Sequence, residues 1–327
     1  MSNSTTKPYA IGIDVGGTTT KFGIVSRDGH ILDQDRILTN AHEVVEDFID
    51  DLYDKLMPMI TKVGGINNII GIGMGAPNAN YYSGNIEYPP NLKWRGIIPI
   101  ADLMHKKFGL TTRLTNDANA AAVGEMTYGV TKGIKHFITI TLGTGVGSGI
   151  VIDGKIVLGH DGFAGELGHT IIRPGGRLHK STKMRGSLEA YASATGVRET
   201  AIELLTLHPD KESLLRDYAL NNITSETVYE CAMQGDTIAN QIFDFTGQIL
   251  GESLANFIMF SSPEVIVLFG GLTKAGNLLL NPTRKAMEAN LLPIFQNKVK
   301  LLFSELKEAD AAILGASALI WDVSEYD

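Results

Sequence analysis

Two glycine-rich turns, each following a short apolar run, are the segments of this chain best suited to bind phosphate groups. The first, residues 14–23, reads Asp-Val-Gly-Gly-Thr-Thr-Thr-Lys-Phe-Gly after the apolar residues 10–13. The second, residues 141–149, reads Thr-Leu-Gly-Thr-Gly-Val-Gly-Ser-Gly after residues 137–140, and the segments that follow the two turns are also alike. Glycine lets a backbone approach a phosphate closely, and successive N–H groups form a concavity that binds anions. The repetition predicts two related halves, each with a β-hairpin, and a two-lobed phosphotransferase that holds nucleotide between its lobes.

Polar side chains in both turns add donors and charge for a nucleotide. Thr18, Thr19 and Thr144 supply hydroxyl groups, and Lys21 supplies a positive charge. Asp14, at the end of the first strand, is placed to hold Mg²⁺ through water, because Mg²⁺ usually keeps several of its waters. The spacing is not that of the G-x-x-x-x-G-K-[ST] P-loop. The turn residues expected to contact the nucleotide are Asp14, Gly16, Gly17, Thr18, Thr19, Lys21, Gly143, Thr144 and Gly145.

A second constellation, Asn116-Asp117-Ala118-Asn119, follows the strand expected at residues 110–114. A carboxylate just past a strand, at the mouth of a cleft, can accept the proton of an attacking hydroxyl group. Asp117 is therefore a candidate general base, a role worth about 10²–10⁴-fold in rate. The same residue types are common helix caps, so a purely structural role for Asn116 or Asp117 is an equal alternative at this point.

A third constellation consists of residues 165–169 (Gly-Glu-Leu-Gly-His) and, twenty residues after His169, Glu189. Two carboxylates and an imidazole suit a ligand with many hydroxyl groups, because each can bond neighbouring hydroxyls. Taken singly, Glu166, His169 and Glu189 are more often solvated or structural residues. Only their combination with the phosphate turns favours a sugar site.

Bulk properties exclude several classes of protein. The 327 residues leave room for two domains with their own cores. A net charge of -8 argues against a nucleic-acid-binding surface. No apolar run approaches the length of a membrane helix, and the polar residues 1–8 lack a secretion signal, so we expect a cytoplasmic protein without membrane partners. The single cysteine, Cys231, excludes an internal disulfide and is expected to be a small buried residue.

The apolar spacing predicts alternating strands and helices, which indicates an α/β architecture. Residues 41–63 carry one apolar helical face, with Pro58 expected to kink or end that helix. The loop that runs to about residue 98 is long for a compact domain, as functional loops often are. Further strands are expected near residues 9–14, 22–26, 68–73, 110–114, 264–269 and 299–303, and further helices near 118–125, 187–206, 211–220, 225–234, 236–260, 282–295 and 310–321.

Together these residues resemble the ROK family of sugar kinases and related repressors, within the actin-like and hexokinase-like ATPase superfamily. The resemblance covers nearly the whole chain. Its most specific segments are residues 14–23, 90–94 (Pro-Asn-Leu-Lys-Trp), 116–119, 144–149, 165–169, 186–189 (Gly-Ser-Leu-Glu) and 270–272 (Gly-Gly-Leu).

The resemblance implies a duplicated ribonuclease H-like motif, with a mixed five-stranded sheet and helices in each of two lobes. A smaller lobe would comprise residues 1–125 plus about 310–327, and a larger lobe residues 126–309. The smaller lobe would carry the first phosphate turn, the sugar loop and the catalytic aspartate. The larger would carry the second turn, further sugar and adenosine contacts and the surface of a homodimer, the usual assembly in the family.

The resemblance also implies roles for particular residues. Asp117 would take the proton of the sugar hydroxyl, with ATP and Mg²⁺ as the phosphate donor and its metal. The sugar would be held by Asn91, Asn116, Asp117, Glu166, His169 and Glu189. ATP would be held by Thr18, Thr19, Thr144, Gly270 and Gly271.

One departure from the family pattern concerns zinc. Many members carry Cys-x-Cys-Gly-x-x-Gly-Cys-Leu-Glu and bind a structural zinc ion through those cysteines and the histidine that corresponds to His169. Here Lys180, Thr182 and Ser187 occupy the cysteine positions, and none of them replaces a thiolate. We therefore expect no zinc site. His169 would then be able to bond the sugar directly, and other contacts would have to order residues 173–187.

The resemblance favours a hexose kinase, with glucose and its 6-hydroxyl as the substrate. The alternatives are an N-acetylmannosamine or N-acetylglucosamine kinase, or a fructokinase, since pocket shape decides between such sugars. A repressor would need a DNA-binding helix-turn-helix ahead of the first strand, where only about nine residues stand. A sugar sensor without catalysis is the other rival, and the intact Asp117 and paired turns weigh against it.

Overall fold

The structure is a computed structural model that describes residues 7–321 and divides the chain into two compact units. Residues 7–135, 149–165 and 305–321 lie in the first unit, and residues 136–148 and 166–304 in the second. The segment 149–165 was expected in the larger lobe on sequence grounds, but it groups with the first unit. Within the described part of the chain, no helix has both the length and the apolar character needed to cross a bilayer.

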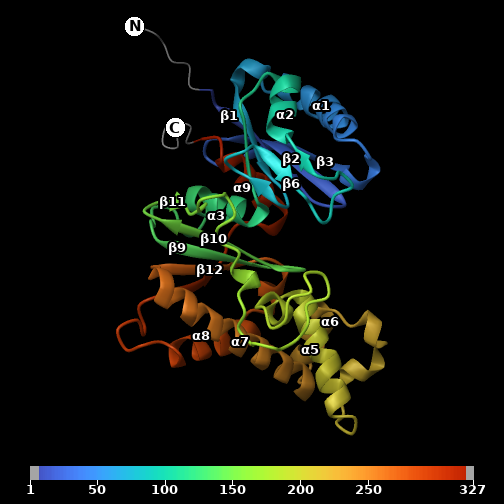
Figure 1. Cartoon of the computed structure of the whole chain (residues 1–327), viewed down its shortest axis with the longest axis vertical. Coiled ribbons are helices and arrows are strands. Elements are labelled where there is room, and N and C mark those ends of the chain that lie inside the picture. Colours follow the sequence, from blue (N-terminus) through green and yellow to red (C-terminus); the bar gives the residue numbers. More distant parts are fainter. Residues whose placement is uncertain (1–6, 322–327) are drawn as a thin grey trace. The chain divides into compact units, whose positions relative to one another are not determined.

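Each half of the chain contributes a five-stranded sheet with the same strand order (Figure 1). In the first sheet the order is β3-β2-β1-β4-β8, and in the second it is β11-β10-β9-β12-β13. The strands of the first sheet are β1 (Tyr9–Val15), β2 (Thr19–Ser26), β3 (Ile31–Leu38), β4 (Ile69–Gly75) and β8 (Thr112–Thr115). Those of the second are β9 (Phe137–Leu142), β10 (Val146–Ile152), β11 (Lys155–Ile156), β12 (Val265–Phe269) and β13 (Lys300–Phe303).

Both sheets combine an antiparallel meander with parallel strands. In the first, β2 pairs with β1 and β3 antiparallel, whereas β4 pairs with β1 and β8 parallel. In the second, β10 and β11 are antiparallel, whereas β12 pairs with β9 and β13 parallel. The repeated glycine hairpins thus belong to a duplicated mixed sheet, which confirms the fold class expected from the sequence.

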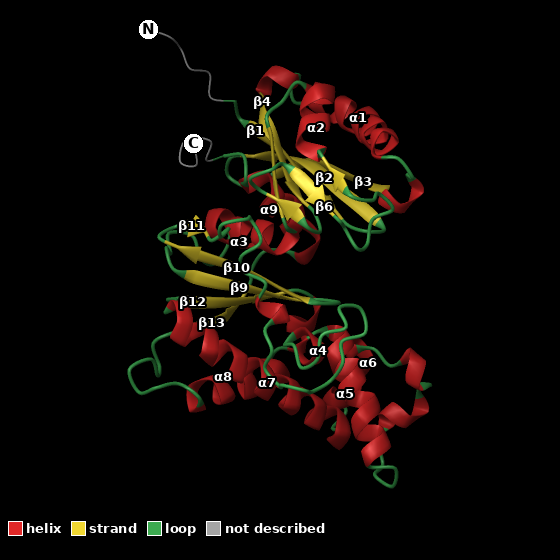
Figure 2. Ribbon diagram, in the orientation of Figure 1, coloured by secondary structure: helices red, strands yellow, loops and turns green. Residues whose placement is uncertain are grey.

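Helices cover both faces of the first sheet (Figure 2). On one face lie α1 (Val45–Lys62) and α2 (Ile100–Phe108), whose apolar side chains join the sheet in one buried cluster. On the other face lies α9 (Glu308–Ala318), and beside it α3 (Asp117–Tyr128). Pro58 does not end α1, which continues to Lys62. The supposed loop before residue 98 contains a small sheet of β5 (Ala79–Asn80), β6 (Asn85–Glu87) and β7 (Ile97–Ile98).

The second unit is mostly helical beyond its sheet. Its helices are α4 (Glu189–Ala192), α5 (Ala194–Leu207), α6 (Ser225–Met233), α7 (Thr237–Ser261) and α8 (Asn277–Ala289). Helix α7 is largely buried and packs closely on α8, because Gly251 leaves no room for a side chain: a Cβ there would lie 2.3 Å from the Thr283 carbonyl oxygen. The predicted helix at 187–206 is split at Ser193, whose hydroxyl accepts the Gly196 N–H and caps α5.

The prediction of a helix at residues 211–220 is wrong. That stretch holds only two short 3₁₀ turns, Leu214–Asp217 and Leu220–Asn222. The Asp236 carboxylate accepts the Leu214 N–H at 2.5 Å, and the Arg216 guanidinium donates to three backbone carbonyl groups. Such side-chain bonds satisfy the backbone in place of a helical ladder.

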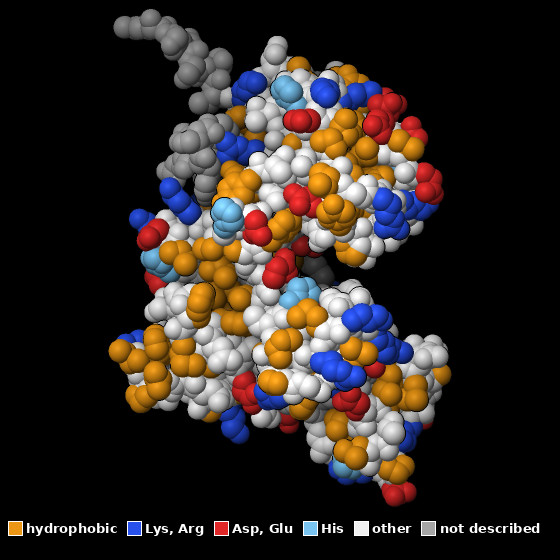
Figure 3. Space-filling model, in the orientation of Figure 1, with side chains coloured by type: hydrophobic (Ala, Val, Ile, Leu, Met, Phe, Trp, Pro, Cys, Tyr) orange, Lys and Arg blue, Asp and Glu red, His pale blue; other side chains and the backbone are white. Residues whose placement is uncertain are grey.

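Charged side chains of both signs are scattered over the face shown in Figure 3, with no continuous basic band across it. The net charge of -8 agrees with this distribution. Neither observation favours a nucleic-acid-binding surface, which needs clustered positive charge.

Candidate active site

Asp14 lies near the end of β1, between the two strands that pair with it. Across the antiparallel pair it faces Lys21 of β2, and across the parallel pair it faces Gly75 of β4. Burial raises the pKa of Asp14 to about 6, the negative charge of Asp117 adds to the rise, and Lys21 opposes it. A carboxylate that is costly to ionise in this way is a suitable ligand for a cation, because the positive charge would offset the repulsion between Asp14 and Asp117.

Asp117 is the first residue of α3, directly after β8. Asn116 is the N-cap: its Oδ1 accepts the Asn119 N–H at 2.7 Å, so the capping role falls to Asn116. The Asp117 Oδ1 accepts the N–H of Ala118 at 2.8 Å. The side chain still reaches solvent, although the protein crowding around it raises its pKa by desolvation. Asp117 is thus available for chemistry, and the Asn116 amide nitrogen is available to a ligand.

Asp14 and Asp117 lie on either side of Gly75. A Cβ built on Gly75 would be 3.8 Å from Asp14 Oδ1 and 3.7 Å from the Asp117 Cα. The ends of the parallel strands β1, β4 and β8 therefore bring the expected metal ligand and the expected base together in the first unit.

The first glycine turn is closed by its own backbone and lies against the loop that carries Asn91. The Gly16 N–H donates to the Thr19 carbonyl group at 3.1 Å. At Gly17 a Cβ would lie only 2.6 Å from the Asn91 carbonyl oxygen, so glycine is required by a close backbone approach. This packing places Asn91, an expected sugar residue, beside the expected phosphate turn.

Several N–H groups of the second glycine turn already have acceptors within the second unit. Gly143 donates to the Gly145 carbonyl group, Val146 to Glu189 Oε2 at 2.9 Å, and Gly147 to Thr141 Oγ1 at 3.1 Å. Any donation to a phosphate from this turn therefore falls to Thr144 and Gly145. The correspondence between the two turns is one of strand position rather than of identical hydrogen bonds.

The remaining nucleotide candidates, Gly270 and Gly271, follow β12 in the same unit. Gly270 has a φ of +105°, and a Cβ there would meet the Leu142 carbonyl oxygen at 2.7 Å. Glycine therefore lets this turn pass close to the end of β9, next to the second phosphate turn.

The sugar candidates of the second unit lie around a short 3₁₀ turn, Leu167–His169. His169 Nε2 lies 3.8 Å from Glu166 Oε2, beyond hydrogen-bond range. His169 Nδ1 is buried and, among the described residues, has no hydrogen-bond partner. Glu189 begins α4; its Oε2 accepts a backbone N–H and its Oε1 lies within ion-pair range of His179, as described below.

The expected site residues thus fall into two groups, each brought together within one unit. The first unit holds Asp14, Gly16, Gly17, Thr18, Thr19, Lys21, Asn91, Asn116 and Asp117. The second unit holds Gly143, Thr144, Gly145, Glu166, His169, Glu189, Gly270 and Gly271.

Comparison with known proteins identifies the family. Residues 10–323 match the ROK family. The chain belongs to this family. A glucokinase from Halalkalibacterium halodurans is 36% identical over 317 residues, which cover 95% of this chain and 94% of that protein. The crystal structure of a ROK family glucokinase from Streptomyces griseus in complex with glucose and AMPPNP gives a TM-score of 0.77 at 30% identity, covering 95% of this chain and 98% of that one. A xylose repressor from Caldicellulosiruptor bescii also matches, at 27% identity over 95% of this chain and 77% of its own length.

The zinc site of many ROK proteins does not fit the side chains found here. Lys180 and Thr182 lie on an exposed hairpin, and Ser187 is buried with a hydroxyl oxygen that has no protein partner among the described residues. An ammonium group and two hydroxyl groups are poor ligands for zinc, which favours thiolate and imidazole. Residues 7–321 bring no three His, Cys, Asp or Glu side chains together as a metal-binding group. That zinc is absent remains a prediction for metal analysis.

Two residues of this ROK protein escaped the sequence reasoning. Arg177 and His179, in the loop where the cysteines would be, make the contacts that order residues 173–187. The sequence offered one signal, which was the loss of all three cysteines before an intact Leu188-Glu189. This loss implies that contacts other than zinc order the loop, but it does not indicate which side chains make them.

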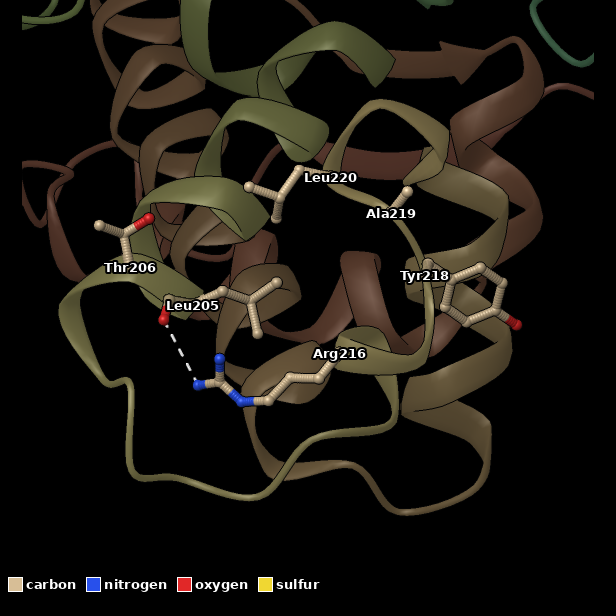
Figure 4. Close-up of a pocket in the computed structure, with 6 residues that line it drawn as sticks. All are labelled: Leu205, Thr206, Arg216, Tyr218, Ala219 and Leu220. Atoms are coloured by element: carbon tan, nitrogen blue, oxygen red, sulfur yellow. Dashed lines mark hydrogen bonds between the residues drawn. The ribbon is translucent and has the colours of Figure 1, made fainter.

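A pocket on the second unit (Figure 4) is lined by none of the expected site residues. Arg216, at its edge, donates to the backbone carbonyl groups of Leu205, His208 and Lys211. Because its guanidinium group is already hydrogen-bonded to three backbone carbonyl groups, Arg216 is not a candidate ligand-binding residue. The pocket is lined by Leu205, Thr206, Arg216, Tyr218, Ala219 and Leu220.

Proposed function

We propose that this protein is an ATP-dependent hexose kinase that phosphorylates the 6-hydroxyl group of glucose. The observation that carries the proposal is the pairing of Asp117 and Asp14 beside the first glycine turn. Membership of the ROK family supports it, as does the 36% identity to a glucokinase. The binding of glucose and AMPPNP by the Streptomyces griseus enzyme supports both substrates.

In this proposal Asp117 accepts the proton of the sugar hydroxyl as that oxygen attacks the γ-phosphorus. A general base must be ionised to act, and the raised pKa of Asp117 makes its carboxylate a stronger base once ionised. The Ala118 N–H bond fixes one carboxylate oxygen, which leaves the other to meet the hydroxyl group.

The two glycine turns bind the phosphate groups through backbone N–H groups and the hydroxyl groups of Thr18, Thr19 and Thr144. Lys21 adds a positive charge, while the turn at Gly270 and Gly271 contributes to adenosine binding. Mg²⁺ bound near Asp14, in part through water, would neutralise charge on the phosphates, on which phosphoryl transfer mainly depends.

The sugar is oriented by carboxylate, amide and imidazole groups. Glu166 and Glu189 accept hydrogen bonds from sugar hydroxyls, and the amide groups of Asn91 and Asn116 donate to them. His169 joins them through a ring nitrogen, since no zinc is expected to occupy it.

A coupled assay of ADP release tests the proposal against glucose, mannose, fructose, N-acetylmannosamine and N-acetylglucosamine. We expect the highest kcat/KM with glucose. Preference for an N-acetylated sugar or for fructose would replace glucose as the substrate, and no turnover with any sugar would favour a sensor.

The role of Asp117 is tested by Asp117→Asn. We expect glucose binding to survive and kcat to fall by about 10²–10⁴-fold, the usual worth of a general base. A variant that retained more than about a tenth of the wild-type rate would show that Asp117 is not the base.

A sugar-responsive repressor is the rival from another class, since a xylose repressor is also similar to this chain. The net charge of -8 weighs against it. A mobility-shift experiment that detected sugar-dependent DNA binding would revive it.

We also propose a cytoplasmic homodimer, for which light scattering on the purified protein is the direct test.

A further inference from the structure

The loop of residues 173–187 is an ordered hairpin without a metal. Isolated antiparallel bridges join Ile171 to Ser187 and Leu178 to Arg185. At the tip, the His179 N–H donates to the Met184 carbonyl group at 2.8 Å. The hairpin begins directly after one expected sugar-binding segment and ends at Glu189, so its shape bears on the sugar site.

Arg177 fixes the base of this hairpin to α5. Its guanidinium group donates to both carboxylate oxygens of Glu203, at 2.9 and 2.5 Å, and to Thr200 Oγ1 at 2.9 Å. It also donates to the carbonyl groups of Ala190 and Gly196, and it stacks on the ring of the nearby Tyr191 at 4.6 Å. A side chain that is only 9% exposed and bonded on every side makes a rigid anchor.

His179 follows two residues later and faces Glu189. Its Nε2 lies 3.2 Å from Glu189 Oε1, and both side chains are only 12% exposed. Its Nδ1 lies 3.4 Å from the Thr182 backbone nitrogen and 2.9 Å from Thr182 Oγ1. Because a backbone N–H can only donate, Nδ1 is an acceptor, so the ring proton is on Nε2, the nitrogen that faces Glu189 Oε1.

The other oxygen of Glu189 is held from the opposite side. Oε2 accepts the Val146 N–H of the second glycine turn at 2.9 Å. Each carboxylate oxygen has a second lone pair, so the group can still accept bonds from sugar hydroxyls. The orientation of Glu189 therefore depends on two donors, of which only His179 is a side chain.

We propose that His179 is a positioning residue that aims the Glu189 carboxylate at the sugar, in place of the zinc-bound loop of other family members. Arg177 holds the hairpin, Thr182 selects the tautomer of His179, and His179 fixes Glu189. The inference rests on the proposed function for the role of Glu189 and on the geometry alone for the link from Thr182 to Glu189.

Steady-state kinetics of His179→Ala and His179→Gln test the role, with Lys180→Ala as the matched control. Lys180 lies on the same hairpin, but its exposed side chain pairs with Glu199, away from Glu189. Loss of a hydrogen bond to a charged group predicts a glucose KM about tenfold to a hundredfold higher for His179→Ala, with the ATP KM within about twofold. Glutamine can donate from a similar position, so His179→Gln should recover most of the affinity.

Thermal unfolding of each variant separates this role from a loss of folding. Should His179→Ala prove unstable, the ring-nitrogen spectrum of the wild-type protein described below still tests the proposal. A glucose KM for folded His179→Ala within about twofold of wild type would overturn the proposal, and so would stoichiometric zinc in the purified protein.

A spectrum of the histidine ring nitrogens, recorded without substrates, tests the geometry independently of catalysis. The signal lost in His179→Gln should show the Nε2-protonated tautomer. Thr182→Val, which removes the Oγ1 contact but keeps the backbone N–H that makes Nδ1 an acceptor, should retain this tautomer. If the tautomer is found but no hexose is phosphorylated, the proposed function fails and the link from Thr182 to Glu189 stands. If hexose is phosphorylated but the proton is on Nδ1, the inference alone fails.

Discussion

At the scale of single residues, the carboxyl group of Asp14 is the proposed Mg²⁺ ligand, and its burial lowers the free energy of unfolding. Its pKa rises from 3.8 to about 6, chiefly through burial and then through the charge of Asp117. The folded protein therefore binds this proton more tightly than the unfolded chain does. As the pH rises from about 4 to about 6, Asp14 therefore lowers the free energy of unfolding. Above about pH 6 this loss reaches about 3 kcal/mol.

The variant Asp14→Asn should remove this cost. We expect its free energy of unfolding to exceed that of wild type by about 1–3 kcal/mol at pH 8 and to equal it near pH 4. Urea unfolding at the two pH values, without Mg²⁺ or nucleotide, is the measurement. The variant should also lose most Mg²⁺-dependent turnover. A variant that is equally stable at both pH values would mean that Asp14 ionises in the fold as it does in water.

The acid side of the activity profile should follow from the same group. Asp14 must be ionised to hold Mg²⁺, so kcat/KM should decline as the pH falls through about 6. Raising the Mg²⁺ concentration should move this midpoint to lower pH, because the cation favours the ionised carboxylate. A midpoint that does not depend on Mg²⁺ would assign the decline to a different group, with Asp117 as the first candidate.

At the scale of elements, the second glycine turn connects the expected phosphate site to Glu189, an expected sugar-binding residue. A Cβ at Gly145 would lie 2.3 Å from Glu189 Oε2, whereas a Cβ at Gly143 would meet nothing within 4 Å. Gly145→Ala should therefore displace Glu189 and weaken glucose binding by about tenfold or more, measured calorimetrically without nucleotide. Gly143→Ala in the same turn is the control and should leave glucose binding unchanged. Equal effects of the two substitutions would show that the turn acts as a whole.

The elements also show how far sequence reasoning reaches. The repeated turn at residues 14–23 and 141–149 predicted two alike halves, and the two sheets have the same strand order. Local patterns sufficed there because strand alternation and glycine turns are short-range signals. They failed at residues 211–220, where Asp236 and Arg216 bind backbone groups and prevent a helix.

The same limit applies to the candidate site. Asp14 and Asp117 were found because each stands at or just past the end of a strand, and parallel strands bring such residues to one edge. Arg177 and His179 were missed because their partners, Glu203 and Glu189, are distant in sequence and meet them only through the packing of the hairpin on α5. Residue type alone gave no reason to prefer this histidine over the seven others.

At the scale of the whole molecule, the first unit is assembled from three separate stretches of chain, the last of which begins near residue 305. Helix α9 and the turn that follows it belong to this last stretch, and they cover one face of the first sheet with the buried side chains of Ile313 and Ile320. The sheet lacks one of its covering layers until the end of the chain is in place. Folding of the unit that contains Asp14 and Asp117 thus depends on residues more than 180 positions further along the chain, as the numbering of Asp117 and α9 shows.

Helix α9 approaches the first sheet so closely at Gly73 that adding one methyl group there should strongly destabilise the protein. A Cβ at Gly73 of β4 would lie 1.8 Å from the Ala316 carbonyl oxygen, which as a backbone atom of α9 cannot turn aside. Gly73→Ala should therefore shift α9 off the sheet and lower the free energy of unfolding by about 3 kcal/mol or more, measured by urea unfolding. Limited proteolysis should then cut within residues 305–321 in the variant. Ala309→Ser, on the exposed side of α9, is the control and should change stability by no more than about 0.5 kcal/mol. A stable Gly73→Ala protein with α9 protected from protease would mean that the sheet and helix tolerate a wider spacing, and that the glycine is not required by their packing.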